Sequence, residues 1–241
     1  MQFIEKYFWV FSTVLVPLLY VCIATIFYLS LYSWKRNTVA AYKIQPEYQD
    51  AVQLKRELFY SAISLLIFAG TGWIVYLLYK NGASLLYLDW RFYGAFYFVA
   101  SIPLMILFHD AYFYWTHRLL HMPGLYDKVH RLHHLSYNAS PFTSLSFHPV
   151  EAVVQAAVLP LVVMIIPIHP YALFTFLIYM VYKNVRGHAG FEFTSTAHRD
   201  KKWNTIYSYP VHHNMHHSEG GGNYGLYFTL WDRVMKTFKK G

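Results

Sequence analysis

The sequence predicts an all-helical integral membrane protein, a bundle of about four to five apolar segments that carries a histidine-rich helical cap. Three observations predict this fold class. Of the 241 residues, 56% are hydrophobic and only 13% are charged, whereas a soluble domain of this size needs about twice that charge to cover its surface. Several uncharged runs are long enough to cross a bilayer. Most of the 14 histidines lie outside those runs, in clusters.

The composition also excludes several classes of protein. A single cysteine, Cys22, rules out a disulfide framework and a cysteine-ligated iron–sulfur cluster within one chain. The formal net charge is +8, but no basic-aromatic module for nucleic-acid recognition is visible, so no nucleic-acid partner is expected. A membrane surface with anionic lipids explains the positive charge better.

The first apolar segment is the run from Tyr7 to Trp34, 28 residues without Asp, Glu, Lys or Arg. A bilayer span needs about 20 residues, and the run lacks the basic leader and the cleavage site of a signal peptide. It therefore predicts a retained transmembrane helix. The polar stretch from Lys35 to Glu57 follows as a connector, so we expect residues 1–57 to form an N-terminal helix with its connector and residues 58–241 to form a second domain.

Three further apolar runs follow in the second domain. Leu58–Tyr79 has 22 uncharged residues and Phe92–Phe108 has 17, and the latter helix should continue into the first histidine pair. Ala152–Tyr182 is uncharged for 31 residues but is divided by two prolines around position 169. Its first arm would be only about 22 Å long, shorter than the hydrocarbon core of about 30 Å. This favours a helical hairpin that crosses shallowly or gains length from flanking residues.

The order of these segments makes a prediction about topology. If the runs pair as two hairpins, every histidine cluster emerges on the side that also holds the connector. That side then carries 17 Lys and Arg residues, and the opposite side carries three: Lys6, Lys80 and Arg91. The positive-inside rule assigns the histidine side to the cytoplasm.

Chemistry-bearing residues are densest between positions 109 and 134, where six histidines fall within 26 residues. Residues three or four apart share a helix face. Three sets have this spacing: His117 and His121; His130, His133 and His134; and His213, His216 and His217. Neutral imidazoles that converge from several helices are typical of a site for a transition metal such as iron, zinc, copper or nickel.

Other polar residues accompany these sets. Asp110 lies on nearly the same face as His117, so it could hold a ligand ring, or it could pair with a nearby arginine. Between the second and third sets, Asn184, His188 and Glu192 follow one another at steps of four. This spacing predicts His188 as a ligand, Asn184 as a weaker ligand or a holder of water, and Glu192 as an acceptor outside the ligand shell. His212 and His109 point away from the ligand faces, and we expect His212 beside the ligands or in solvent.

Nine imidazoles fit two metals and overfill one, because a metal takes four to six donors. A single structural zinc would leave five histidines unexplained, and a haem would need only two. Hydrolytic two-metal sites usually include bridging carboxylates, which the clusters lack. The donor set therefore favours two oxygen-activating iron ions.

The motifs that carry these residues resemble those of the fatty acid hydroxylase / sterol desaturase superfamily. Their sequences are closer to those of sterol desaturase-type members. The similarity runs from about His109 to Thr237. Its six pieces are Tyr114–His121, His130–His134, Ser146–Glu151, Gly187–Glu192, His213–His217, and Asn223 to Arg233. One departure is Asn184, which stands where some members have another histidine, so one metal could have an open or water-filled position.

The resemblance implies a membrane oxidoreductase that uses O2 and two electrons to hydroxylate or desaturate a lipid. The motif sequences favour a sterol or sterol-like lipid as the substrate, with fatty-acyl or carotenoid hydroxylation as the alternative. The resemblance also implies that the nine histidines bind two iron ions, with zinc as a possible misloaded metal. A separate donor, either a cytochrome b5-like protein or a ferredoxin with its reductase, would supply the electrons. The membrane would be the bacterial inner membrane or the endoplasmic reticulum.

Two points stay open at this stage. His148 and Glu151 fall where the chain re-enters the bilayer and could line the substrate entrance or form an ordinary interfacial turn. A protein of another class, a zinc-dependent membrane hydrolase or a metal-binding protein without oxygenase activity, is the rival reading of the same histidines.

Overall fold

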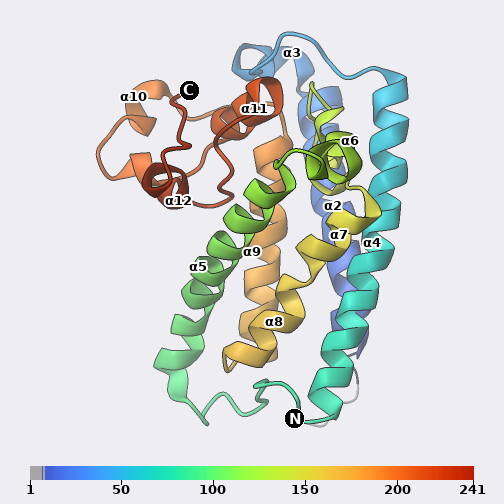
Figure 1. The fold of residues 1–241 in the computed structure, drawn as a ribbon, viewed down its shortest axis with the longest axis vertical. Helices are drawn as coiled ribbons and strands as arrows, with labels where there is room; N and C mark the ends of the chain where they lie inside the picture. Colours follow the sequence, from blue (N-terminus) through green and yellow to red (C-terminus); the bar gives the residue numbers. More distant parts are fainter. Residues whose placement is uncertain (1–6, 8) are drawn as a thin grey trace.

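The chain forms a bundle of long, roughly parallel helices with a cap of short helices at one end (Figure 1). The computed structural model describes Tyr7 and residues 9–241, so Lys6, one of the three basic residues expected on the far side, lies outside the described residues. Within the described part, all regular elements are helical and extended backbone pairs only in isolated bridges. The all-helical fold class is confirmed.

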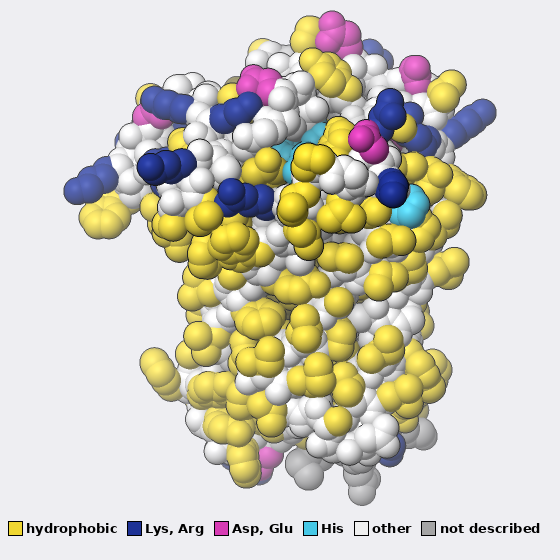
Figure 2. Space-filling view, in the orientation of Figure 1, with side chains coloured by type: hydrophobic (Ala, Val, Ile, Leu, Met, Phe, Trp, Pro, Cys, Tyr) yellow, Lys and Arg dark blue, Asp and Glu magenta, His cyan; other side chains and the backbone are white. Residues whose placement is uncertain are grey.

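Three helical segments are long and apolar enough to cross a membrane. The first, Thr13–Trp34, runs through η1 (Phe11–Leu15), α2 (Val16–Tyr28) and η2 (Leu29–Trp34). The other two are α4 (Ala51–Lys80) and α5 (Gly94–Leu120). In Figure 2 the surface below the cap is covered mainly by hydrophobic side chains, and Lys and Arg gather on the cap. This surface fits an integral membrane protein.

A shorter apolar hairpin completes the bundle. It consists of α7 (Pro149–Ala156) and α8 (Val158–Ile165), which return through α9 (Pro170–His188). The loop between α4 and α5 covers its turn, since Leu85 N donates to Val163 O at 2.8 Å and Tyr87 N donates to Ile168 O at 3.1 Å. Ile168 is fully buried there. The short arm need not reach the far membrane surface, because protein encloses its turn and satisfies its backbone.

Helix α4 begins seven residues before the apolar run that predicted it. Asp50 caps it by accepting a hydrogen bond from Gln53 N at 2.7 Å. Its first two turns therefore include Glu57, which is completely buried. The Glu57 carboxylate accepts hydrogen bonds from Ser140 Oγ at 2.5 Å and Thr143 Oγ1 at 2.8 Å. The domain boundary expected after residue 57 thus falls inside α4, at a point where this helix is bonded to the loop that precedes α7.

The cap gathers the short elements from three parts of the chain. They are α3 (Arg36–Val39), η3 (Ala40–Tyr42), η4 (Tyr126–His130), α6 (Arg131–His134), η5 (Pro141–Leu145), α10 (Thr196–Arg199), η6 (Asn204–Ile206), α11 (Pro210–Glu219) and α12 (Leu230–Val234). Helices α5 and α9 both end in the cap (Figure 1). As a result, every segment that carries a histidine cluster meets at the same end of the bundle.

Candidate metal centre

The nine predicted histidines form two compact groups in the cap. The five-histidine group contains His117, His121, His130, His134 and His216, and the four-histidine group contains His133, His188, His213 and His217. Within each group, one ring nitrogen from every residue lies within 4.8 Å of the others. Four and five donors are the numbers that one metal ion each accommodates.

Helical periodicity explains how adjacent histidines separate into different groups. His130 and His134 stand four residues apart and point to the five-histidine group, while His133 is turned toward the other group. On α11, His213 and His217 likewise face one group and His216 faces the other. Each H-x-x-H-H motif therefore contributes ligands to both groups, because successive residues on a helix are rotated by about 100°.

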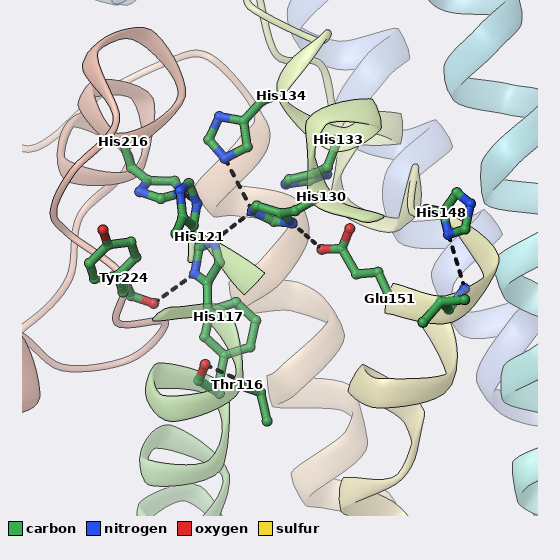
Figure 3. Close-up of polar contacts among 12 residues, drawn as sticks. Thr116, His117, His121, His130, His133, His134, His148, Glu151, His216 and Tyr224 are labelled. Carbon is green, nitrogen blue, oxygen red and sulfur yellow. Dashed lines mark hydrogen bonds and ion pairs between the residues drawn. The ribbon is translucent and has the colours of Figure 1, made fainter. Parts of the chain in front are cut away.

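The ring nitrogens that face one another are the Nε2 atoms. In the five-histidine group, His130 Nε2 lies 3.1 Å from both His117 Nε2 and His134 Nε2. In the four-histidine group, His188 Nε2 lies 2.8 Å from His213 Nε2 and 3.2 Å from His133 Nε2. Figure 3 shows His117 and His134 directed toward the ring of His130.

Acceptors outside the groups hold the opposite nitrogen of several rings. His117 Nδ1 donates to Tyr224 O at 3.0 Å, and His216 Nδ1 donates to Gly222 O at 2.7 Å. His188 Nδ1 donates to the backbone carbonyl of Asn184 at 2.8 Å. A proton on Nδ1 leaves a lone pair on Nε2, so lone pairs converge in the middle of each group. A cation between them would remove that repulsion, and the residues present therefore fit a metal.

Burial keeps these imidazoles neutral, which is the form that binds metal. Burial, followed by the neighbouring imidazoles, lowers the pKa of His121 to about 2. Burial chiefly lowers the pKa of His134 to about 3. The same cause holds the pKa of His213, His216 and His217 well below the ordinary value for histidine.

Glu151 holds the ring of His130, a contact that we did not derive from the sequence. The two side chains are almost completely buried, and His130 Nδ1 donates to Glu151 Oε1 at 2.8 Å (Figure 3). From the sequence, Glu151 was a candidate either for the substrate entrance or for an ordinary interfacial turn. Its neighbour His148 caps α7, accepting a hydrogen bond from Val150 N at 3.3 Å, and lies away from both groups.

Asp110 contacts backbone instead of a ligand ring. Its Oδ1 accepts hydrogen bonds from Tyr227 N at 3.0 Å and Phe228 N at 3.1 Å. The buried His109 beside it bonds Tyr227 OH through Nδ1 at 2.8 Å. Asp110 therefore positions the segment after residue 222, which also supplies the carbonyls that hold His117 and His216.

The remaining accompanying residues also lie outside the two groups. Glu192 accepts from Thr194 N at 2.8 Å and from Val211 N at the start of α11. His212 Nδ1 accepts from Tyr209 N at 3.3 Å. Burial is the main cause that lowers the pKa of His212 to about 4. These residues position α11, and neither side chain contacts a histidine of the two groups.

A turn at residues 222–225 was the part of the site that sequence reasoning missed. Asp232 fixes it, because its carboxylate accepts from Tyr224 N and Gly225 N, each at 2.9 Å. A Cβ atom at Gly222 or Gly225 would lie 2.4 Å from a backbone oxygen, so only glycine fits at either position. The resemblance already included the N-Y-G…W-D-R motif, and the structure gives that motif a role in holding ligand rings.

An apolar pocket lies on the membrane side of the two groups. Two phenylalanines line the pocket next to the histidines. The ring centroids of Phe113 and His117 are 5.1 Å apart, and those of Phe147 and His133 are also 5.1 Å apart. The other lining residues come from α2, α4, α5, α7 and α9 and from the segments before α7 and α12. Among them are two amides, Gln155 and Asn184. A single phenylalanine ring thus lies between the pocket and each histidine group.

Comparison with known proteins agrees with the family resemblance of the sequence motifs. A family model described as fatty acid hydroxylase matches residues 102–237. A Delta(7)-sterol 5(6)-desaturase of Schizosaccharomyces pombe is 33% identical over 66% of this chain and 50% of the relative. The Delta(7)-sterol 5(6)-desaturase of Candida glabrata is 28% identical over 96% of this chain and 60% of the relative. Human lathosterol oxidase is 32% identical over 61% of this chain and 48% of the relative.

The chain thus spans about half to three-fifths of the length of these curated relatives. No solved structure matches it.

Proposed function

Because this chain belongs to the fatty acid hydroxylase family, we propose that it is a membrane-bound di-iron oxygenase that uses O2 and two electrons to desaturate or hydroxylate a sterol-like lipid. The observation that carries the proposal is the convergence of nine buried or half-buried imidazoles into groups of five and four. The sterol desaturase and oxidase names of the relatives support the class of substrate and reaction.

The donor set favours iron over hydrolytic zinc. Within the described residues, both groups consist of histidine alone, and Glu151 reaches the five-histidine group only through His130. Imidazole nitrogen suits iron, and neither group has the carboxylate bridge that is common in two-metal hydrolases. Two iron ions in these groups would supply the oxidising power that removes hydrogen from an unactivated C–H bond, which side chains cannot supply.

The residues around the groups have three tasks in this proposal. The carbonyls of Tyr224 and Gly222 and the carboxylate of Glu151 keep ligand rings in one orientation. Phe113 and Phe147 form the apolar wall of the pocket at the point nearest to the groups. The apolar pocket accepts the lipid from the membrane side. A substrate that stays in lipid is thereby brought next to the metal ions.

Two electrons must come from outside the chain. The single cysteine cannot build an iron–sulfur cluster, so we propose a separate carrier, either a cytochrome b5-like protein or a ferredoxin with its reductase. Among the described residues, 17 Lys and Arg lie on the cap side and two, Lys80 and Arg91, on the other, and this balance supports a cytoplasmic cap. The carrier would then dock from the cytoplasm.

The test is iron reconstitution followed by reductant, O2 and a sterol such as lathosterol, with product masses read by mass spectrometry. Loss of two hydrogen atoms would identify desaturation, and gain of one oxygen atom would identify hydroxylation. Reductant-dependent oxygen consumption should accompany either product. Tight zinc binding without oxygen consumption in the iron-loaded protein, together with hydrolysis of a lipid ester, would contradict the proposal and favour the zinc hydrolase.

A further inference from the structure

The apolar pocket contains polar atoms without partners. Four of its lining residues carry polar side chains. Tyr20 OH is bonded to Ser61 Oγ and Phe142 O, and His109 is bonded to Tyr227 OH. The other two are the amides of Gln155 and Asn184. Unpaired amides in an apolar pocket cost free energy, so their presence points to a ligand group that pairs with them.

Gln155 lies on α7 and is only 7% exposed. No hydrogen bond joins its amide to any of the described residues. A glutamine amide has both a donor and an acceptor, and leucine or methionine would fill the same place in an apolar wall without this cost. Packing alone therefore does not explain the amide of Gln155.

Asn184 lies on α9, and its amide has a fixed orientation. Its Nδ2 donates to the backbone carbonyl of Ser144 at 2.8 Å, so the NH2 group must face that oxygen. The other atom of the amide, Oδ1, is buried and has no hydrogen-bond partner. This oxygen is therefore an acceptor that lacks a donor.

The two amides lie at the same depth below the histidine groups. Gln155 is four residues beyond Glu151, which holds His130, and Asn184 is four residues before the ligand candidate His188. Helix α7 descends from the cap and α9 ascends to it (Figure 1). Four residues rise about 6 Å, slightly more than one helical turn, so both amides stand about one turn on the membrane side of the ligand layer.

From this placement we propose that Gln155 and Asn184 are specificity-determining residues that bind the hydroxyl group of the substrate. The inference rests on the oxygenase function proposed above and deepens it. The hydroxyl group donates to Asn184 Oδ1 and accepts from the Gln155 amide. The substrate therefore lies with its hydroxyl-bearing end near the metals and its apolar remainder toward the membrane.

The chemistry of a sterol fits this orientation. Its hydroxyl group is separated by two carbon–carbon bonds from carbon 5, and carbons 5 and 6 are the pair named in the desaturases that resemble this chain. A hydroxyl anchored about one turn below the ligand layer would keep those carbons within a few bonds of the anchor, in the part of the sterol nearest to the histidine groups. A fatty-acyl chain inserted by its methyl end would leave the Gln155 amide and Asn184 Oδ1 without partners, so the pair selects against it.

The test is equilibrium binding of lathosterol and of its analogue without the hydroxyl group to the iron-loaded chain, kept without reductant so that no turnover occurs. The wild-type chain should bind lathosterol about tenfold more tightly than the analogue, as expected for a buried hydrogen-bonded group. Gln155→Met should bring that ratio close to one. This substitution breaks no hydrogen bond within the described residues, so it tests the amide without removing a structural contact.

Asn184→Leu is the second variant, and Met180→Leu is the matched control. Met180 lines the same pocket on α9 but has no amide, so its variant should keep the wild-type preference. Asn184→Leu should lose the preference and retain its full iron content. Loss of iron in this variant would instead make Asn184 a metal ligand or a ligand holder and would overturn its assigned role.

Equal binding of the two compounds by the wild-type chain, or no binding of either, would overturn the inference, as would a preference that survives in Gln155→Met. These outcomes are separable from failure of the proposed function. Turnover of a lipid without a hydroxyl group would support the oxygenase function but would contradict a role of the amide pair in substrate recognition. A binding preference for the hydroxyl group without any oxidised product would support the role of the amide pair and contradict the oxygenase function.

Discussion

Single residues outside the ligand set decide how the imidazoles are presented. Glu151 and the carbonyls of Tyr224 and Gly222 accept hydrogen bonds from the Nδ1–H groups of three rings in the five-histidine group. That leaves the Nε2 lone pairs directed inward. Partners of this kind usually change metal affinity by about 10- to 100-fold when they are removed. The five-histidine group should therefore depend on them as strongly as on a ligand.

Glu151→Met should weaken iron binding by about 10- to 100-fold in the five-histidine group, because His130 loses the acceptor that fixes its ring. Glu151→Gln keeps an acceptor oxygen and should retain more iron. The measurement is titration of the iron-loaded protein with a competing chelator. Val150→Ala, at an exposed neighbouring position, is the control. Unchanged chelator resistance in Glu151→Met would mean that the contact does not position His130.

At the scale of elements, the apolar runs predicted which segments are helical but not where they begin. Helix α4 extends back to Ala51 because Asp50 caps it and because Glu57 finds buried partners in Ser140 and Thr143. Charge alone had marked this stretch as connector. A partner 83 residues away cannot be read from local composition.

The histidine sets were predictable from spacing, since residues at i, i+3 and i+4 share a helix face. Their division into two groups was not, because it depends on how α6 and α11 are rotated against each other. The role of Asp110 was also beyond periodicity, since its partners Tyr227 and Phe228 lie 117 and 118 residues away.

Glu57→Ala should destabilise the junction between α4 and the segment before α7. It removes a buried acceptor of bonds from Gln53, Ser140 and Thr143, and each bond to a charged group contributes about 1.5–3 kcal/mol. The melting temperature in detergent should fall by several degrees. Lys55→Gln, at an exposed position on the same helix, should leave it unchanged. A melting temperature equal to that of the wild type would show that the buried carboxylate does not stabilise this junction.

At the scale of the whole molecule, the two ends of the bundle differ in charge as well as in chemistry. Both histidine groups and most basic residues lie at the cap (Figure 2). The opposite end holds the loop between α4 and α5, with Lys80 and Arg91. This asymmetry is the basis for placing the cap in the cytoplasm.

In a Cys22→Ser background, Lys80→Cys should react with a membrane-impermeant maleimide added outside intact bacterial cells that express the chain. Lys201→Cys, in the cap, should react only after permeabilisation. The expected pattern follows from the positive-inside distribution of Lys and Arg. Labelling of Lys201→Cys but not of Lys80→Cys in intact cells would reverse the orientation and put the electron donor on the other side.

The most direct test of the central claim is the iron content of the chain after anaerobic reconstitution, measured by mass spectrometry of the metal in the wild type, His216→Ala and His133→Ala. These two histidines belong to different groups. The account predicts two iron ions per wild-type chain and a selective loss of one ion in each variant. A wild-type chain that binds a single ion, or two variants that both keep two, would contradict it.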